Sequence, residues 1–146
     1  MKTFGKQFLI LGYFSILLSL NGCGGMKLEC GSLESRNSVV KIVADNNNNK
    51  LVNYAANNSS AVAAMVGDAN TEADKLAILE TAKRGAVYKL DDTILMKSRD
   101  RAGHAVTCSG ALDVTVADTT AQKEVEFRVE QTRDGMMLVS VDPFLF

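Results

Sequence analysis

The sequence predicts an α+β domain in which N-terminal helices pack on a four-stranded antiparallel meander. Apolar residues recur at helical spacing before Gly85 and at alternating positions after it. Short turn sequences divide the alternating part, and Asp134-Gly135 is the strongest hairpin signal among them. Because the helical part precedes the strands as a block, the helices are expected to cover the apolar face of one sheet.

The first 22 residues, MKTFGKQFLILGYFSILLSLNG, have the pattern of a secretory signal peptide. Lys2 and Lys6 give a positive start, and Phe8–Leu20 is an apolar run of about 13 residues. A helix that spans a bilayer needs roughly 20 residues. A basic start, a short apolar core and a small residue before the cleavage point together predict export.

The end of this segment, Leu20-Asn21-Gly22-Cys23, resembles the lipobox of bacterial lipoproteins. The resemblance implies that Cys23 is acylated after removal of residues 1–22 and that this covalent lipid anchors the protein to the membrane. Several acyl chains make a stable anchor, whereas a single chain holds only marginally. Gly24, rather than Asp, after the cysteine implies the outer membrane of the cell envelope, facing the periplasm. An ordinary cleaved signal with Cys23 a plain thiol and an uncleaved anchor are the alternatives.

The remainder of the chain is slightly acidic and long enough for one compact domain. The sequence of 146 residues has 16 basic and 17 acidic side chains, and Lys2 and Lys6 of the leader are among the basic ones. No basic footprint of a nucleic-acid-binding protein is present, so nucleic acid is not expected as a partner. Residues 23–36 are rich in Gly, Ser and charge and predict a lipid-anchored tether. Residues 37–146 are then the small periplasmic domain.

Two cysteines remain once Cys23 is assigned to lipid. In an oxidising compartment Cys30 and Cys108 are expected to form one disulfide. The loop closed would have about 78 residues, for which the chain-entropy model gives ~4 kcal/mol of stabilisation. Two free thiols are the alternative. A zinc site is not expected, because the two cysteines have no CxxC partner and the chain has one histidine.

Helical spacing predicts a first helix from a cap at Asn37-Ser38 to about Tyr54. The run Asn46–Asn49 interrupts its apolar stripe. We expect one helix to continue through this run with the asparagines facing outward, and a loop between two short helices is the alternative. Residues 57–70 are predicted to be a loop that contains a turn of helix.

A second helix is predicted from Thr71 to about Lys83. Thr71 and Asp74 resemble a capping box with Asp in place of Glu, and Gly85 ends the helix. The apolar residues Leu76, Ile78 and Leu79 are expected to pack against the sheet.

Four strands are expected after Gly85. The first strand has one apolar face and a polar kink at Asp91-Asp92, and the second places Cys108 on its apolar face. The third strand points Val125, Phe127 and Val129 inward. The last strand covers Met136 to Val141. The apolar face expected for the first strand consists of Tyr88, Leu90, Ile94 and Met96.

No catalytic residues are expected. His104 lies in a turn, and Cys108 would be about 13 Å away along a strand, too far for a nucleophile and its base. Asp91 and Asp92 predict a kink in an edge strand, since no partner acid or calcium-binding pattern accompanies them. An enzyme, a metal site and a cofactor other than the lipid at Cys23 are therefore not expected.

The apolar sequence Phe144-Leu145-Phe146 either packs in the core or forms a contact with a partner. The domain is loosely similar to small lipoproteins of cystatin-like or nuclear-transport-factor-2-like shape, with one cysteine near the start and one in a middle strand. That likeness transfers no catalytic residue.

The expected function is that of a membrane-anchored bacterial lipoprotein whose small non-catalytic domain binds another envelope protein, as an accessory subunit of an envelope assembly. Tethering raises the effective concentration of such a domain near its partner. The alternative is an inhibitor or exclusion lipoprotein that blocks a lysozyme-like enzyme or a phage or conjugation receptor. A small hydrolase is the third hypothesis.

Overall fold

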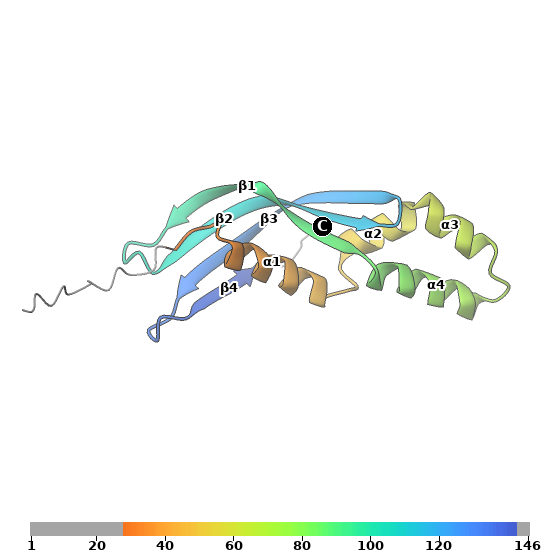
Figure 1. The fold of residues 1–146 in the computed structure, drawn as a ribbon, viewed down its shortest axis with the longest axis horizontal. Coiled ribbons are helices and arrows are strands. Elements are labelled where there is room, and N and C mark those ends of the chain that lie inside the picture. Colours follow the sequence, from red (N-terminus) through yellow and green to blue (C-terminus); the bar gives the residue numbers. More distant parts are fainter. Residues whose placement is uncertain (1–27, 143–146) are drawn as a thin grey trace, which may run out of the picture.

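The computed structural model describes residues 28–142, in which four helices precede a four-stranded sheet (Figure 1). The elements in chain order are α1 (Leu33–Asp45), α2 (Lys50–Asn58), α3 (Ser60–Gly67), α4 (Glu72–Arg84), β1 (Val87–Arg99), β2 (Ala105–Val116), β3 (Thr119–Gln131) and β4 (Met137–Val141). The strands pair antiparallel in the order β1-β2-β3-β4. The predicted fold class is therefore confirmed.

The two central strands, β2 and β3, carry the core. They pair over their whole length, from Ala105 opposite Glu130 to Val116 opposite Thr119. Alternate residues of both strands are buried on one face of the sheet: Val106, Cys108, Leu112, Val114, Val116, Ala121, Val125, Phe127 and Val129. Alternation of side chains along a strand explains why the opposite face of β3 is polar.

Helices α1 and α2 cover this apolar face. Val39 and Val43 of α1 and Leu51, Val52 and Ala55 of α2 are buried in the same cluster as the strand residues. Helix α1 contacts β1 and β4, whereas α2 contacts β2 and β3. The first two helices thus form one layer and the sheet the other.

The single helix expected through the asparagine run is wrong: α1 ends at Asp45 and α2 begins at Lys50. Asn49 caps α2, because its Oδ1 accepts a hydrogen bond from the Val52 N–H at 2.9 Å. Its Nδ2 donates to the Tyr88 hydroxyl at 3.1 Å. Asparagine favours caps over helix interiors because its side chain competes for backbone groups. The loop between two short helices is the observed alternative.

The folded domain begins earlier than residue 37. Leu28 and Cys30 are buried, with exposed fractions of 4% and 6%. Helix α1 starts at Leu33 instead of near Ser38, because the Ser32 hydroxyl accepts a hydrogen bond from the Ser35 N–H and caps the helix. Residues 28–36, which composition assigned to the tether, therefore belong to the domain: Ser32 caps α1, and Ser35 within α1 binds the Glu29 carbonyl.

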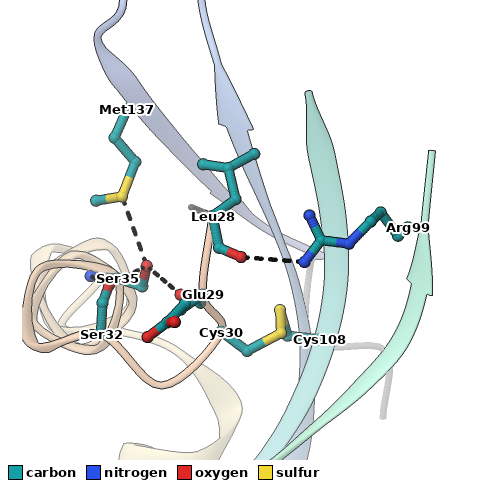
Figure 2. Close-up of a disulfide and its surroundings, with 8 residues drawn as sticks. All are labelled: Leu28, Glu29, Cys30, Ser32, Ser35, Arg99, Cys108 and Met137. Carbon is teal, nitrogen blue, oxygen red and sulfur yellow. Dashed lines mark hydrogen bonds between the residues drawn. A yellow bond between two sulfur atoms is a disulfide. The ribbon is translucent and has the colours of Figure 1, made fainter. Parts of the chain in front are cut away.

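A disulfide joins this first segment to the middle of the sheet (Figure 2). The Cα atoms of Cys30 and Cys108 are 5.8 Å apart. Beside the disulfide, the Leu28 carbonyl accepts a hydrogen bond from Arg99 Nη2 at 3.2 Å, and the Glu29 carbonyl accepts one from the Ser35 hydroxyl at 3.1 Å. Residues 28–30 are thus held to the sheet by the disulfide and Arg99, and to α1 by Ser35.

Strand β1 lies at one edge of the sheet, and its pairing with β2 shifts between Leu90 and Ile94. The kink expected at Asp91-Asp92 is therefore present. A second shift follows between Met96 and Ser98. The expected apolar face of β1 is only partly buried, since Leu90 is 2% exposed and Met96 49%.

Candidate functional site

Helices α3 and α4 form a hairpin that extends beyond one end of the sheet (Figure 1). None of the 13 residues of α4, all of which the structure describes, is buried, and in α3 only Val62 is. Leu79 and Ala82 of α4 are partly buried against the core cluster. The hairpin therefore rests on the domain at its base and is exposed along most of its length.

Side-chain caps define both helices of the hairpin. The Ser59 hydroxyl accepts a hydrogen bond from the Val62 N–H at 3.1 Å, and the Thr71 hydroxyl accepts one from the Asp74 N–H at 3.1 Å. The predicted cap at Thr71 and the predicted end of the helix at Gly85 are confirmed. The sequence predicts a loop with a turn of helix over residues 57–70; they instead hold the end of α2 and a full eight-residue helix, α3, which Ser59 caps.

A groove of about 470 Å³ lies between the two helices. It is lined by Met65 of α3 and by Asp74, Ala77, Ile78, Thr81 and Ala82 of α4. Met65 is 47% exposed, and Leu76 on the same hairpin is 62% exposed. Leu76, which was expected to pack against the sheet, therefore faces solvent.

The charges of α4 pair with one another along the helix. Lys75 forms an ion pair with Glu72 at 2.7 Å, and Lys83 forms one with Glu80. The Asp74 carboxylate at the edge of the groove accepts a hydrogen bond from the Thr71 hydroxyl at 2.7 Å. The groove is thus an apolar surface with a small polar rim, which suits apolar side chains of a ligand.

Asp118, in the tight turn between β2 and β3, attaches the start of α3 to the sheet. Its carboxylate accepts hydrogen bonds from the Ser59 and Ser60 hydroxyls and, at 3.2 Å, from the Ala61 N–H. The Ser59 hydrogen bond is the largest cause that lowers the pKa of Asp118 from 3.8 to about 2, followed by that of Ser60. A carboxylate at a helix N-terminus also compensates the helix dipole.

The preceding residue, Ala117, has φ 49°. This left-handed conformation is costly for alanine but is required where two residues connect paired strands. The turn therefore holds Asp118 against α3 at the expense of some local strain.

The residues for which the sequence considered catalysis lie at three separate places in the described domain. His104 is exposed in the turn before β2, and the Cys108 sulfur is bonded to Cys30, so it is not a nucleophile. Asp91 accepts a hydrogen bond from the Thr93 N–H at 3.0 Å, and Asp92 forms an ion pair with Arg36 of α1. These interactions hold the kink of β1.

Two sets of predicted site residues lie outside the described residues. These are the lipidation site, Cys23, and the candidate partner contact, Phe144, Leu145 and Phe146. Among residues 28–142, no three His, Cys, Asp or Glu side chains are placed to hold a metal ion. No helix in the same range is long and apolar enough to cross a bilayer.

Sequence reasoning missed the exposed hairpin. The signal that could have found it is the composition of Ser60–Gly67, SAVAAMVG, whose apolar residues occupy all sides of a helix too short to be buried on all of them. The apolar residues of α4 also lack one continuous stripe.

In comparisons with known proteins, no family model, no curated protein and no solved structure matches this chain.

Proposed function

We propose that this protein is a lipid-anchored module of the bacterial envelope that binds another envelope protein through the α3–α4 hairpin and performs no catalysis. The observation that carries the proposal is the exposure of the hairpin. A helix of 13 residues with no buried side chain, which shares an apolar groove with its neighbour, gains little from the rest of its own domain. Helices in globular proteins are stabilised mainly by packing of an apolar face.

The partner that fits the groove is an amphipathic helix. The hairpin offers two helices about 12 and 20 Å long, at 1.5 Å per residue. A third helix with apolar side chains at its i, i+3 and i+4 positions would complete a small three-helix layer and cover Met65 and Ile78, which line the groove. The paired charges of α4 favour an apolar contact over a strongly charged one.

The lipid anchor rests on residues 1–23 and remains a prediction from the sequence. It would hold the domain near the membrane, because the five residues from Cys23 to Leu28 span at most roughly 17 Å. The described chain starts at the end of the molecule opposite α3 and α4 (Figure 1). This geometry would direct the hairpin away from the anchor, toward a partner in the periplasm or at its far side.

Site-specific photo-crosslinking in intact cells tests the binding surface. A photoreactive amino acid at Met65, which lines the groove, should give one discrete cross-linked product with a partner protein. The same amino acid at Leu138, on the other face of the sheet and of similar exposure (54% against 47% for Met65), is the matched control. No product at the hairpin, or equal products at Leu138, would contradict the proposal.

Fatty-acid labelling tests the anchor separately. The full chain should incorporate a labelled fatty acid, and Cys23→Ser should abolish incorporation. If the cross-linked partner is a foreign lytic enzyme or a phage or conjugation component, the inhibitor or exclusion function replaces the assembly role while the same surface is retained. Labelling that persists in the Cys23→Ser variant would contradict the lipid assignment.

A further inference from the structure

The β1–β2 turn, residues 100–104, and the β3–β4 turn, residues 132–136, lie side by side at the end of the molecule opposite α3 and α4 (Figure 1). The Gln131 N–H, directly before the second turn, donates a hydrogen bond to the His104 carbonyl of the first turn at 2.8 Å. Most residues of both turns are exposed. The two turns, here called the basal turns, therefore form one exposed surface.

The basal turns and the adjacent end of β1 carry more basic than acidic side chains. The basic ones are Arg99, Arg101 and Arg133, and the acidic ones are Asp100 and Asp134. The Asp100 carboxylate already accepts a hydrogen bond from the Ala105 N–H at 3.1 Å. Among the described residues, no ion pair involves Arg101 or Arg133. Two exposed guanidinium groups of this surface are therefore available to an anion outside the domain.

The opposite end of the molecule has the reverse charge. The α3–α4 connection, the first turn of α4 and the β2–β3 turn carry four acidic side chains and one basic side chain: Asp68, Glu72, Asp74, Asp118 and Lys75. Lys75 is paired with Glu72. The charge of the domain is thus polarised along its longest axis (Figure 1). A protein with such a charge distribution is oriented by a surface of one sign, and anionic lipid attracts its basic end.

We propose that the basal turns rest on the membrane surface, against the headgroups of anionic phospholipids. The inference rests on the proposed lipid anchor at Cys23 and adds a contact that holds the domain in one orientation. The Leu28 carbonyl accepts a hydrogen bond from Arg99 Nη2 at 3.2 Å, so the described chain begins beside the basal turns.

The length of chain between the anchor and the domain brings this surface within range of the lipid. The five residues from Cys23 to Leu28 span at most roughly 17 Å. The Debye length at physiological ionic strength is about 8 Å. An anchored domain therefore keeps the start of its described chain within about two Debye lengths of the headgroups, where charges of the basal turns still interact with them.

Met136 gives the same surface an apolar side chain. It is 61% exposed and lies three residues after Arg133 in the β3–β4 turn. A flexible, unbranched thioether adapts to irregular apolar surroundings such as the boundary between headgroups and acyl chains. A guanidinium group forms paired hydrogen bonds with the oxygens of a phosphate. Unpaired arginines next to an exposed methionine therefore suit a surface with phosphates outside and acyl chains beneath.

Tryptophan fluorescence in vesicles tests the proposal on the lipidated chain purified from membranes. The protein has no tryptophan, so one introduced tryptophan is the sole reporter of its kind. In vesicles of phosphatidylglycerol and phosphatidylcholine with brominated acyl chains, the emission of Met136→Trp should be quenched at least about twofold, because the reporter lies at the headgroup boundary. Leu76→Trp, at the opposite end and of matched exposure (62% against 61%), is the control and should keep its emission.

A charge variant separates electrostatic contact from apolar insertion alone. Arg101→Gln and Arg133→Gln, introduced together into the Met136→Trp protein, should shift the equilibrium between contact and release by about 30-fold, since each basic group gains from the anionic surface. Quenching should then fall to the level of the Leu76→Trp control. Undiminished quenching in this variant, or equal quenching in vesicles of phosphatidylcholine alone, would overturn the proposal.

Sedimentation with the same vesicles reports on the anchor separately. Protein that sediments while the Met136→Trp emission is unquenched would overturn the membrane contact of the basal turns and leave the anchor at Cys23 in place. Protein that stays in the supernatant would overturn both the anchor and this inference.

Discussion

Replacement of both Cys30 and Cys108 by alanine should lower the free energy of unfolding by about 4–5 kcal/mol. The disulfide joins residues separated by 78 positions. For a loop of this size the chain-entropy relation gives about 4.5 kcal/mol at 25 °C, because the cross-link restricts the unfolded chain. A domain of this size has a total stability of roughly 5–15 kcal/mol. The variant is therefore expected to lie close to its unfolding limit.

Urea unfolding followed by circular dichroism measures this difference. All proteins carry Cys23→Ser, so that no third thiol can exchange with the pair. Reductant should lower the stability of the cysteine-containing protein to nearly that of the double-alanine variant and leave the variant unchanged. If the variant is unfolded without urea, sulfate, which strengthens apolar burial, should restore a transition.

A loss below about 1 kcal/mol, with an unchanged denaturant slope, would mean that residues 28–30 stay on the sheet without the disulfide. The hydrogen bonds of the Leu28 and Glu29 carbonyls would then suffice to hold the segment.

Two further predictions concern side chains that join the helices to the sheet. Asp118→Ala should destabilise the protein at neutral pH, and the difference in stability between the variant and the wild-type protein should disappear in acid. The pKa of Asp118 in the folded protein is lowered from 3.8 to about 2, so the stabilisation is complete above pH 3.8 and is lost as the pH falls through about 2. Thermal melts of both proteins from pH 7 to 2 measure the difference in melting temperature. A difference that stays constant over this range would contradict the prediction. Asn49→Ala removes the cap of α2 and the hydrogen bond to Tyr88, and should cost about 1–2 kcal/mol in urea unfolding. Asn57 is exposed in the same helix, and Asn57→Ala is the control, which should be neutral or stabilising. An equal loss of unfolding free energy in the two variants would show that the cap and the Tyr88 hydrogen bond of Asn49 do not stabilise the protein.

The strands could be predicted from sequence because their signals are local. Val125, Phe127 and Val129, expected to point inward, are 3%, 1% and 0% exposed. The Asp134-Gly135 signal marks the observed hairpin, in which Gly135 has φ 81°. Period-two alternation and turn residues determine each of these features within a few positions of the chain.

The candidate binding surface could not be predicted in the same way. Leu76 and Leu79 have the same side chain three positions apart in one helix, yet Leu76 is 62% exposed and Leu79 is partly buried against the core. Which of them finds a neighbour depends on where the Asp118 turn holds the hairpin. Pairs such as Asp118 with Ser59 lie 59 positions apart in sequence, and no local pattern specifies such a contact.

Stability is distributed unevenly between the two ends of this molecule. At one end the disulfide and Arg99 join the first described residues to the sheet. At the other end the hairpin is attached through the buried Val62, the partly buried Leu79 and Ala82, and the exposed Asp118. Segments with few buried contacts open at low free-energy cost, and binding surfaces are often drawn from them. If the proposed function holds, the hairpin would adjust to its partner while the core of β2 and β3 keeps its packing. A fixed end next to the predicted tether and an adaptable end farthest from it are consistent with a domain that is anchored at one end and binds at the other.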